Sequence, residues 1–257
     1  MTRTNPKIVI INLPASVERR EVITRHLASL GLSGEVFPAI DGRQLSEDEL
    51  AVVYDAKKAE TTEWGQLTRG EIGCALSHRA IWKSLIDSGD AGWLVIEDDI
   101  VLAPDVPEWL AQLSELAQDG DVVPFVKTSP TPYYFRRVKL ASRWLVYPNQ
   151  SFIGATAYYI TPLAARRLLE ASTPIWFPTD CWYSTPGFKG VTPVRAVWPE
   201  AVGLTDESIE GSVIGFRQAQ DQAKRKKSAQ RSYLRQQYGK FRRYIKNSFL
   251  VKPVRFD

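Results

Sequence analysis

Cysteine and histidine are scarce in this sequence, and this scarcity excludes several classes of protein. Among 257 residues there are two cysteines and two histidines. The cysteines, Cys74 and Cys181, stand alone and lack the CxxC or CxxH spacing of structural zinc sites. Two isolated thiols also do not make the disulfide framework of a small secreted domain. We therefore expect a protein of the reducing cytosol that is stabilised by an apolar core.

Long hydrophobic runs are missing as well. The apolar run at residues 7–12 (KIVIIN) has the length of one β-strand and is shorter than the core of a signal peptide. No other segment approaches the roughly 20 apolar residues that a membrane-spanning helix requires. The sequence thus predicts a cytoplasmic protein without a transmembrane helix.

Positive charge is concentrated near the C-terminus. Residues 217–257 hold 13 of the 33 Lys and Arg residues and 2 of the 29 Asp and Glu residues, so the basic excess belongs to this tail. Apolar residues recur in it at intervals of three and four, which is typical of an amphipathic helix. They are Leu234, Tyr238, Phe241, Ile245 and Phe249.

We predict a main domain over residues 1–216 and a basic helical tail over residues 217–257 that binds the cytoplasmic membrane surface. A helix packed on its own domain and an RNA-binding tail are the alternatives. The acidic main domain lacks a recognised nucleic-acid-binding motif, so we expect no nucleic acid partner.

Short β-branched segments alternate with segments of helical character along the main domain. Two capping-box patterns, residues 46–49 (SEDE) and 68–71 (TRGE), predict helix starts, and Ser16 is the expected cap of an earlier helix. Strands are expected at residues 7–13, 36–40, 93–96, 121–127, 155–160 and 194–198, and a loop with a short hairpin at 128–149.

This alternation predicts an α/β fold with a mostly parallel central sheet. Ligands of such sheets bind at the carboxyl ends of the strands, so candidate site residues are expected there.

Three consecutive carboxylates, Glu97, Asp98 and Asp99, directly follow the strand expected at residues 93–96. They repel one another and are costly to desolvate, and a cation that prefers oxygen ligands, Mn²⁺ or Mg²⁺, relieves this cost. On an extended backbone Glu97 and Asp99 point to one side and Asp98 to the other. We predict that Glu97 and Asp99 bind the metal and that Glu97 and Asp98 contact the substrate. The alternative is a surface turn with acidic residues near a helix N-terminus.

The sequence resembles glycosyltransferase family 25, whose members act in lipooligosaccharide biosynthesis. The specific matches are residues 10–13 (IINL) with 18–20 (ERR), 37–42 (FPAIDG), 67–78 (LTRGEIGCALSH) and 93–100 (WLVIEDDI); looser matches are 154–158 (GATAY) and 178–180 (PTD). The resemblance covers residues 7 to about 210 and leaves out the tail.

The resemblance implies a GT-A type, Rossmann-like domain that transfers a hexose from a UDP-sugar, UDP-galactose or UDP-glucose, with inversion at the anomeric carbon. The implied acceptor is a sugar hydroxyl of a bacterial lipooligosaccharide or lipopolysaccharide (LPS). Such an enzyme is expected at the inner face of the cytoplasmic membrane, where the basic tail would hold it.

Further candidate substrate-binding residues follow the first two predicted strands. Asn12, Arg19 and Arg20 are placed to contact UDP, because the planar guanidinium matches phosphate oxygens. A solvated helix face is the alternative for the two arginines. Asp41 and Gly42 fit a ribose or uracil contact, although Asp-Gly is also a common turn.

The resemblance implies that Ser77 and His78 face the donor. The alternative for His78 is a structural role, which is more common for a single histidine in a helix. We expect His26 to be structural. An inverting transfer needs a general base. Asp180, which matches the family's Pro-x-Asp pattern, is the candidate base, and Glu200 is the second choice. Nearby aromatic side chains either stack on sugars or fill the core; they are Trp176, Phe177, Trp182 and Tyr183.

A hypothesis from a different class is a non-catalytic binding or scaffold protein on a glycosyltransferase-like fold, with the tail as its working part. The intact run of Glu97, Asp98 and Asp99 argues against it.

Overall fold

A five-stranded sheet forms the centre of the protein in the computed structural model, which describes residues 4–62, 64–126, 133–148, 154–184 and 191–204. Its strands lie in the order β2-β1-β3-β8-β5 and are β1 (Lys7–Asn12), β2 (Glu35–Pro38), β3 (Trp93–Glu97), β5 (Val122–Pro124) and β8 (Ala157–Ile160). β1 is parallel to β2 and β3, whereas β8 is antiparallel to β3 and β5. Four strands therefore share one direction, which confirms the α/β class with a mostly parallel sheet.

The carboxyl ends of β1 and β3 lie side by side. The register pairs Ile10 with Ile96 and Ile11 with Glu97, so both strands end at the same edge of the sheet. β2 joins this edge on the other side of β1, where Asn12 is opposite Pro38. The segments that follow these three strands consequently meet at one place, as the rule for ligand sites in open sheets requires.

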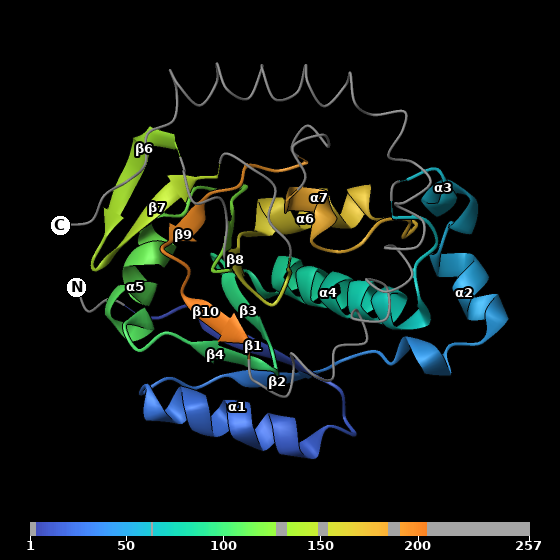
Figure 1. The fold of residues 1–257 in the computed structure, drawn as a ribbon, viewed down its shortest axis with the longest axis horizontal. Helices are drawn as coiled ribbons and strands as arrows, with labels where there is room; N and C mark the ends of the chain where they lie inside the picture. Colours follow the sequence, from blue (N-terminus) through green and yellow to red (C-terminus); the bar gives the residue numbers. More distant parts are fainter. Residues whose placement is uncertain (1–3, 63, 127–132, 149–153, 185–190, 205–257) are drawn as a thin grey trace, which may run out of the picture.

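Helices cover both faces of the sheet, with α1 (Val17–Ser29) on one side in Figure 1 and α4 (Arg69–Ser88) and α6 (Pro162–Ala171) on the other. Alternate residues of each strand enter the two cores. In β1, Ile10 packs in the core that contains Ile23 of α1, and Val9 packs in the core that contains Ile81 of α4. Because β1 is buried on both faces, its sequence is a continuous apolar run.

Both predicted capping boxes are present. Glu71 Oε2 accepts from the backbone N–H of Thr68 at 2.7 Å, while Thr68 Oγ1 accepts from the N–H of Glu71 at 3.2 Å, and α4 ends at Gly89 with φ of +78°. Ser46 and Glu49 form the same pair at the start of α2 (Glu47–Val53). Ser16 is the residue at the N-cap position of α1, as predicted, but its side chain makes no capping bond, because its ψ of 62° lies outside the extended region of a side-chain cap.

Two smaller sheets complete the fold. β4 (Ile100–Leu102) pairs with β10 (Val202–Leu204), and the predicted hairpin is present as β6 (Tyr133–Leu140) and β7 (Arg143–Tyr147), with β9 (Ala196–Trp198) beside β7. The remaining elements are η1 (Gly42–Gln44), α3 (Ala56–Glu60), α5 (Val106–Leu116) and α7 (Cys181–Ser184). β4 and β10 were not predicted, because three residues are too few to show an alternation.

The predicted tail, residues 217–257, lies outside the described residues, so the boundary at residue 216 stays a prediction. Within the described ranges, no helix has the length and apolar character needed to cross a membrane.

Candidate functional site

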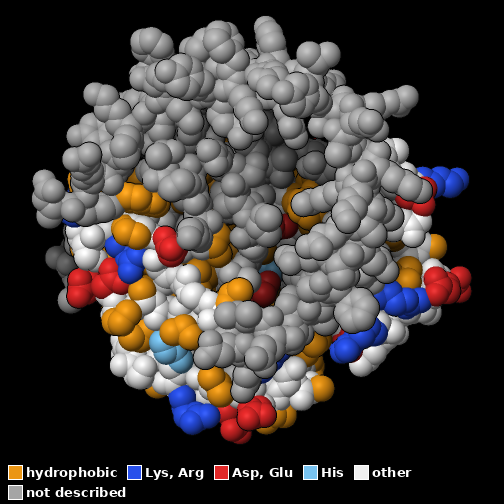
Figure 2. Space-filling model, viewed as in Figure 1, with side chains coloured by type: hydrophobic (Ala, Val, Ile, Leu, Met, Phe, Trp, Pro, Cys, Tyr) orange, Lys and Arg blue, Asp and Glu red, His pale blue; other side chains and the backbone are white. Residues whose placement is uncertain are grey.

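The acidic run lies where the chain leaves the central sheet. Glu97 is the last residue of β3, and Asp98 and Asp99 form the turn that leads into β4. Glu97 and Asp99 would share a side only on an extended backbone, and the backbone instead turns here, as in the alternative of a surface turn, and β4 pairs with β10. Glu97 lies on the side of α4, whereas Asp98 lies on the side of α1, as the following contacts show. Figure 2 shows acidic side chains set back near the centre of the view.

Asn12 and Arg19 hold Asp98 on the α1 side. Asn12, which is 1% exposed at the end of β1, donates through Nδ2 to Asp98 Oδ2 at 2.6 Å and to the Ser16 carbonyl at 2.9 Å. Arg19 Nη1 of α1 lies 3.6 Å from Asp98 Oδ1 and 4.0 Å from Asp99 Oδ2. The Arg19 side chain is 41% exposed, so its guanidinium borders both the carboxylates and solvent.

The carboxylates are only partly compensated. Burial raises the pKa of Asp99 to about 6, with repulsion from Glu97 and Asp98 adding to the effect. Burial also raises the pKa of Asp98, against the hydrogen bond from Asn12 and the charge of Arg19. Asp99 Oδ1 is buried and has no hydrogen-bond partner among the described residues. An orphaned carboxylate oxygen among partly compensated acids fits the oxygen ligands that Mn²⁺ and Mg²⁺ require.

His78 of α4 faces Glu97 from the other side of the sheet. Its ring is fully buried, and Nδ1 lies 2.7 Å from the hydroxyl oxygen of Tyr158 in β8. Trp82 Nε1 donates to that same oxygen at 2.9 Å. His78 Nε2 is 3.6 Å from Glu97 Oε1 and has no hydrogen-bond partner in the described part of the chain. His26, in contrast, accepts from the N–H of Leu102 at 2.9 Å and is structural, as expected.

Cys74 and Asp180 border the same region. Cys74 precedes His78 by one helical turn, and its Sγ lies within 4.8 Å of ligand atoms of His78 and Glu97. Asp180 Oδ2 accepts from the N–H of Gly154 at 2.8 Å, and burial nevertheless raises the pKa of Asp180. Desolvation and the nearby carboxylates of Glu97 and Asp180 together raise the pKa of the Cys74 thiol. The predicted base and Glu97 thus both lie within electrostatic reach of Cys74.

The loop that follows β2 holds residues that the structure does not bring into contact with the acids. Asp41 accepts from Arg43 Nε at 2.8 Å and Nη2 at 2.7 Å, and these bonds lower the pKa of Asp41 to about 2. Gly42 packs so closely on α4 that a Cβ atom there would collide with the Arg69 carbonyl. Ser77 Oγ accepts from the N–H of Ile40 at 2.8 Å. These contacts fix the loop against α4.

Arg20 forms no ion pair within the described ranges, in contrast to Arg19. Glu200 is exposed, and its backbone carbonyl accepts from Arg143 Nη1 at 2.6 Å. Of the aromatic side chains near Asp180, three are buried and fill the core: Phe177, Trp182 and Tyr183. Trp176 is partly buried, with Lys58 Nζ 4.2 Å from the centre of its ring.

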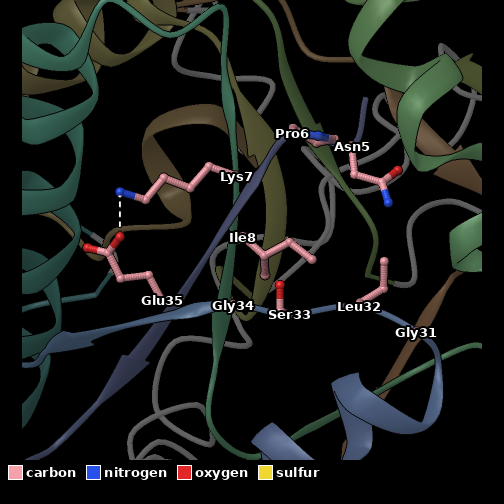
Figure 3. Close-up of a pocket in the computed structure, with 9 residues that line it drawn as sticks. All are labelled: Asn5, Pro6, Lys7, Ile8, Gly31, Leu32, Ser33, Gly34 and Glu35. Atoms are coloured by element: carbon pink, nitrogen blue, oxygen red, sulfur yellow. Dashed lines mark ion pairs between the residues drawn. The ribbon is translucent and has the colours of Figure 1, made fainter. Parts of the chain in front are cut away.

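A cavity of about 730 Å³ lies at the opposite end of β1, lined by residues 5–8 and 31–35. Figure 3 shows Lys7 and Glu35 in it, joined by an ion pair of 2.7 Å. Lys7 and Glu35 begin β1 and β2, so this cavity borders the amino ends of the strands. Ligand sites of open sheets lie at the carboxyl ends of the strands, which is where Glu97, Asp98 and Asp99 are found.

Sequence reasoning missed Cys74 and Tyr158 as neighbours of the acids. Cys74 had a signal in the sequence, because residues four apart share one face of a helix and His78 is four residues later. Tyr158 had none, since its contact with His78 joins residues that are 80 positions apart.

Comparison with known proteins finds similarity to one family. The model described as "Glycosyltransferase family 25 (LPS biosynthesis protein)" matches residues 5–183. A "Glycosyltransferase 25 family member" of Aedes aegypti is 33% identical over an alignment of 177 residues that covers 63% of this chain and 28% of that protein. A "Probable inactive glycosyltransferase 25 family member 3" of Bos taurus is 33% identical over 66% of this chain and 29% of that protein.

The human "Procollagen galactosyltransferase 2" is 36% identical over 97 residues, or 37% of this chain and 16% of that protein. The chain thus spans less than a third of the length of these relatives. A crystal structure of mannose-1-phosphate geranyltransferase from Thermus thermophilus aligns with a TM-score of 0.36 and 15% identity, over 76% of this chain and 74% of that one.

Proposed function

Because this chain belongs to glycosyltransferase family 25, we propose that it transfers a hexose from a UDP-sugar to a hydroxyl of an acceptor sugar. The observation that carries this proposal is the gathering of Asn12, Arg19 and three carboxylates where β1 and β3 end. Galactose as the transferred sugar is supported by the relative named procollagen galactosyltransferase. An LPS acceptor is supported by the family's description.

Arg19 is the residue proposed to bind the diphosphate of the donor. Its guanidinium is partly exposed beside Asp98 and Asp99, at distances of 3.6 and 4.0 Å that leave its N–H groups available to phosphate oxygens. Asn12 orients Asp98 through their 2.6 Å hydrogen bond, so that the carboxylate can accept from a sugar or ribose hydroxyl.

Glu97 and Asp99 are the residues proposed to hold Mn²⁺ or Mg²⁺. The raised pKa of Asp99 and its unpartnered Oδ1 indicate that these acids lack compensating positive charge in the protein alone. A bound cation would supply that charge and stabilise the departing UDP.

Asp180 is the proposed general base for an inverting transfer. A base works best when its pKa lies close to the operating pH, and burial raises the pKa of Asp180 in that direction. Hydrogen bonds from the N–H of Gly154 and from Cys181 fix its carboxylate in place.

The enzyme is proposed to work at the inner face of the cytoplasmic membrane, held there by the basic tail. A non-catalytic binding protein is the second candidate, because one relative is named a probable inactive family member. Turnover of a donor separates the two candidates.

The test measures UDP release from UDP-galactose and UDP-glucose with Mn²⁺, using lipooligosaccharide core as the acceptor. Wild-type protein is expected to release UDP with one donor, and Asp99→Ala to lose this activity while keeping its circular dichroism spectrum. Inversion is checked by the anomeric configuration of the product. A fully active Asp99→Ala variant removes the metal assignment, and a wild-type protein that turns over no donor supports the binding protein.

A further inference from the structure

Three potential metal ligands of different chemistry converge beside the acidic turn. Cys74 and His78 lie four residues apart on one face of α4, and Glu97 ends β3 opposite them. One ligand atom from each lies within 4.8 Å of the others, and His78 Nε2 is 3.6 Å from Glu97 Oε1. Ligand atoms on a tetrahedral zinc ion are about 3.3–3.8 Å apart, given bond lengths near 2.0–2.3 Å. Small side-chain rotations would therefore close the site.

The unpartnered nitrogen of His78 points to a ligand. The ring is fully buried, yet Nε2 has no hydrogen-bond partner among the described residues. A buried nitrogen without a partner carries an uncompensated desolvation cost. The 3.6 Å separation from Glu97 is longer than a hydrogen bond, so the carboxylate does not remove this cost.

Tyr158 fixes the orientation that a ligating histidine needs. His78 Nδ1 lies 2.7 Å from the Tyr158 hydroxyl oxygen, and Trp82 Nε1 holds that oxygen from the other side at 2.9 Å. Histidines that bind metal nearly always donate their second ring N–H to an oxygen in this way, which sets the tautomer with a free lone pair on the first nitrogen. When Nδ1 donates to Tyr158 in this way, the free lone pair is on Nε2, toward Cys74 and Glu97.

We propose that Cys74, His78 and Glu97 form a binding site for a soft divalent cation, Zn²⁺. Sulfur and imidazole ligands favour zinc over Mg²⁺ and Mn²⁺, which prefer oxygen. Three protein ligands leave a fourth position for water, the arrangement of an open zinc site. This site is distinct from the one proposed for Mn²⁺ or Mg²⁺ but shares Glu97 with it. Zinc therefore inhibits the transferase by withdrawing Glu97, and this consequence alone rests on the proposed function.

Cobalt titration of the full-length protein tests the site, because a cobalt–thiolate bond gives a charge-transfer absorption band that oxygen ligands do not give. We expect one equivalent of Co²⁺ to produce the band and Zn²⁺ to displace it. Cys181→Ala, which removes the other cysteine, is the matched control and is expected to keep the band. Cys74→Ser is expected to lose it, and Tyr158→Phe to weaken cobalt binding about 10–100-fold.

Thermal melting of each variant establishes that it is folded. Absence of the band in wild-type protein, or an equally strong band in Cys74→Ser, overturns the proposal. Asp99→Asn separates this inference from the proposed function, since it removes a ligand proposed for Mn²⁺ and leaves the zinc ligands in place. A cobalt band retained in Asp99→Asn supports a separate site, whereas its loss overturns the separation.

Discussion

Asn12 at the end of β1 donates a 2.6 Å hydrogen bond to Asp98, which follows β3 and lies 86 residues further along the chain. The parallel pairing of β1 with β3 brings the two residues to the same edge of the sheet. Asn12 is almost completely buried, so this bond fixes the acidic turn to the central sheet. The candidate site is in this way built on the rigid part of the fold.

Arg19 and Arg20 are adjacent in the sequence and are expected to differ in function. Arg19 lies 3.6 Å from Asp98, whereas Arg20 pairs with no carboxylate in the described part of the protein. Loss of a charge-assisted contact to diphosphate costs about 1.5–3 kcal/mol, so Arg19→Ala should weaken UDP binding about 10–100-fold. Arg20→Ala, the matched control, should change it less than about twofold. Calorimetric titration with UDP gives both values, and equal losses would contradict the assignment to Arg19.

Asp99 should make the metal-free protein less stable as pH rises. Its pKa is raised from 3.8 to about 6 in the folded protein, so between these values the folded state binds more protons than the unfolded state. The free energy of unfolding therefore falls as pH rises from about 4 to about 6, and the loss persists above that range. Asp99→Asn removes this charge and should stabilise the metal-free protein by about 1–3 kcal/mol at pH 7.5.

Melting temperatures in the presence of a chelator at pH 4 and pH 7.5 check this prediction. Asp99→Asn should gain over wild type at the higher pH, and the gain should shrink at the lower pH. A difference between the two proteins that is the same at both pH values would show that the charge of Asp99 is not the cause.

Arg143 should be important for stability rather than for transfer. It donates to both oxygens of Asp105 at 2.7 and 2.6 Å and to the carbonyls of Pro199 and Glu200, and its side chain is 12% exposed. Removing one partner of such a pair leaves an uncompensated charge, so Arg143→Met should lower the free energy of unfolding by about 3 kcal/mol. Urea unfolding measures this loss.

Lys83→Met serves as the comparison, because Lys83 pairs with Asp87 at 3.1 Å on the exposed surface of α4. This substitution should lower the free energy of unfolding by less than about 0.5 kcal/mol. The Arg143 bonds lower the pKa of Asp105 to about 2, so their stabilisation is present above pH 4 and is lost as pH falls toward 2. Similar losses for the two variants would contradict a special role for Arg143.

The tail should bind anionic membranes through both charge and apolar contact. Vesicles that contain anionic lipid should pellet the full-length protein, and a truncation after residue 216 should remain in solution. Replacing Phe241 and Phe249 with Asp should abolish binding even though every basic residue of the tail remains. Equal binding to anionic and neutral vesicles would contradict a contribution of the basic charges to membrane binding. Unchanged binding by the double variant would contradict a contribution of the apolar side chains.

Local signals in the sequence predicted the framework of the site well. The apolar run of β1 and the capping box of Thr68 and Glu71 depend on neighbouring residues, and both are present as predicted. The rule that ligands bind at strand ends also placed Asn12, Arg19 and the acids near one another. The turn at Asp98 and Asp99 was only the alternative interpretation, because it depends on β10, which pairs with β4 from about 100 residues away.

Long-range side-chain contacts could not be predicted from local sequence patterns. The direction of β8 determines that Tyr158 reaches His78, and no periodicity in the sequence encodes that direction. The carboxylate of Asp41, which stays a candidate for a donor contact, bonds to Arg43 two residues later. A pattern such as Asp-Gly does not show which of several nearby donors a side chain will use.

Calorimetric titration of the purified protein with UDP and a panel of UDP-hexoses, with and without Mn²⁺, examines the proposed donor site itself. We expect binding that requires Mn²⁺, prefers one UDP-hexose and is lost in Asp99→Ala. Absence of binding by every UDP compound, with or without the metal, would contradict the account and leave the roles assigned to Arg19, Glu97, Asp99 and Asp180 without support.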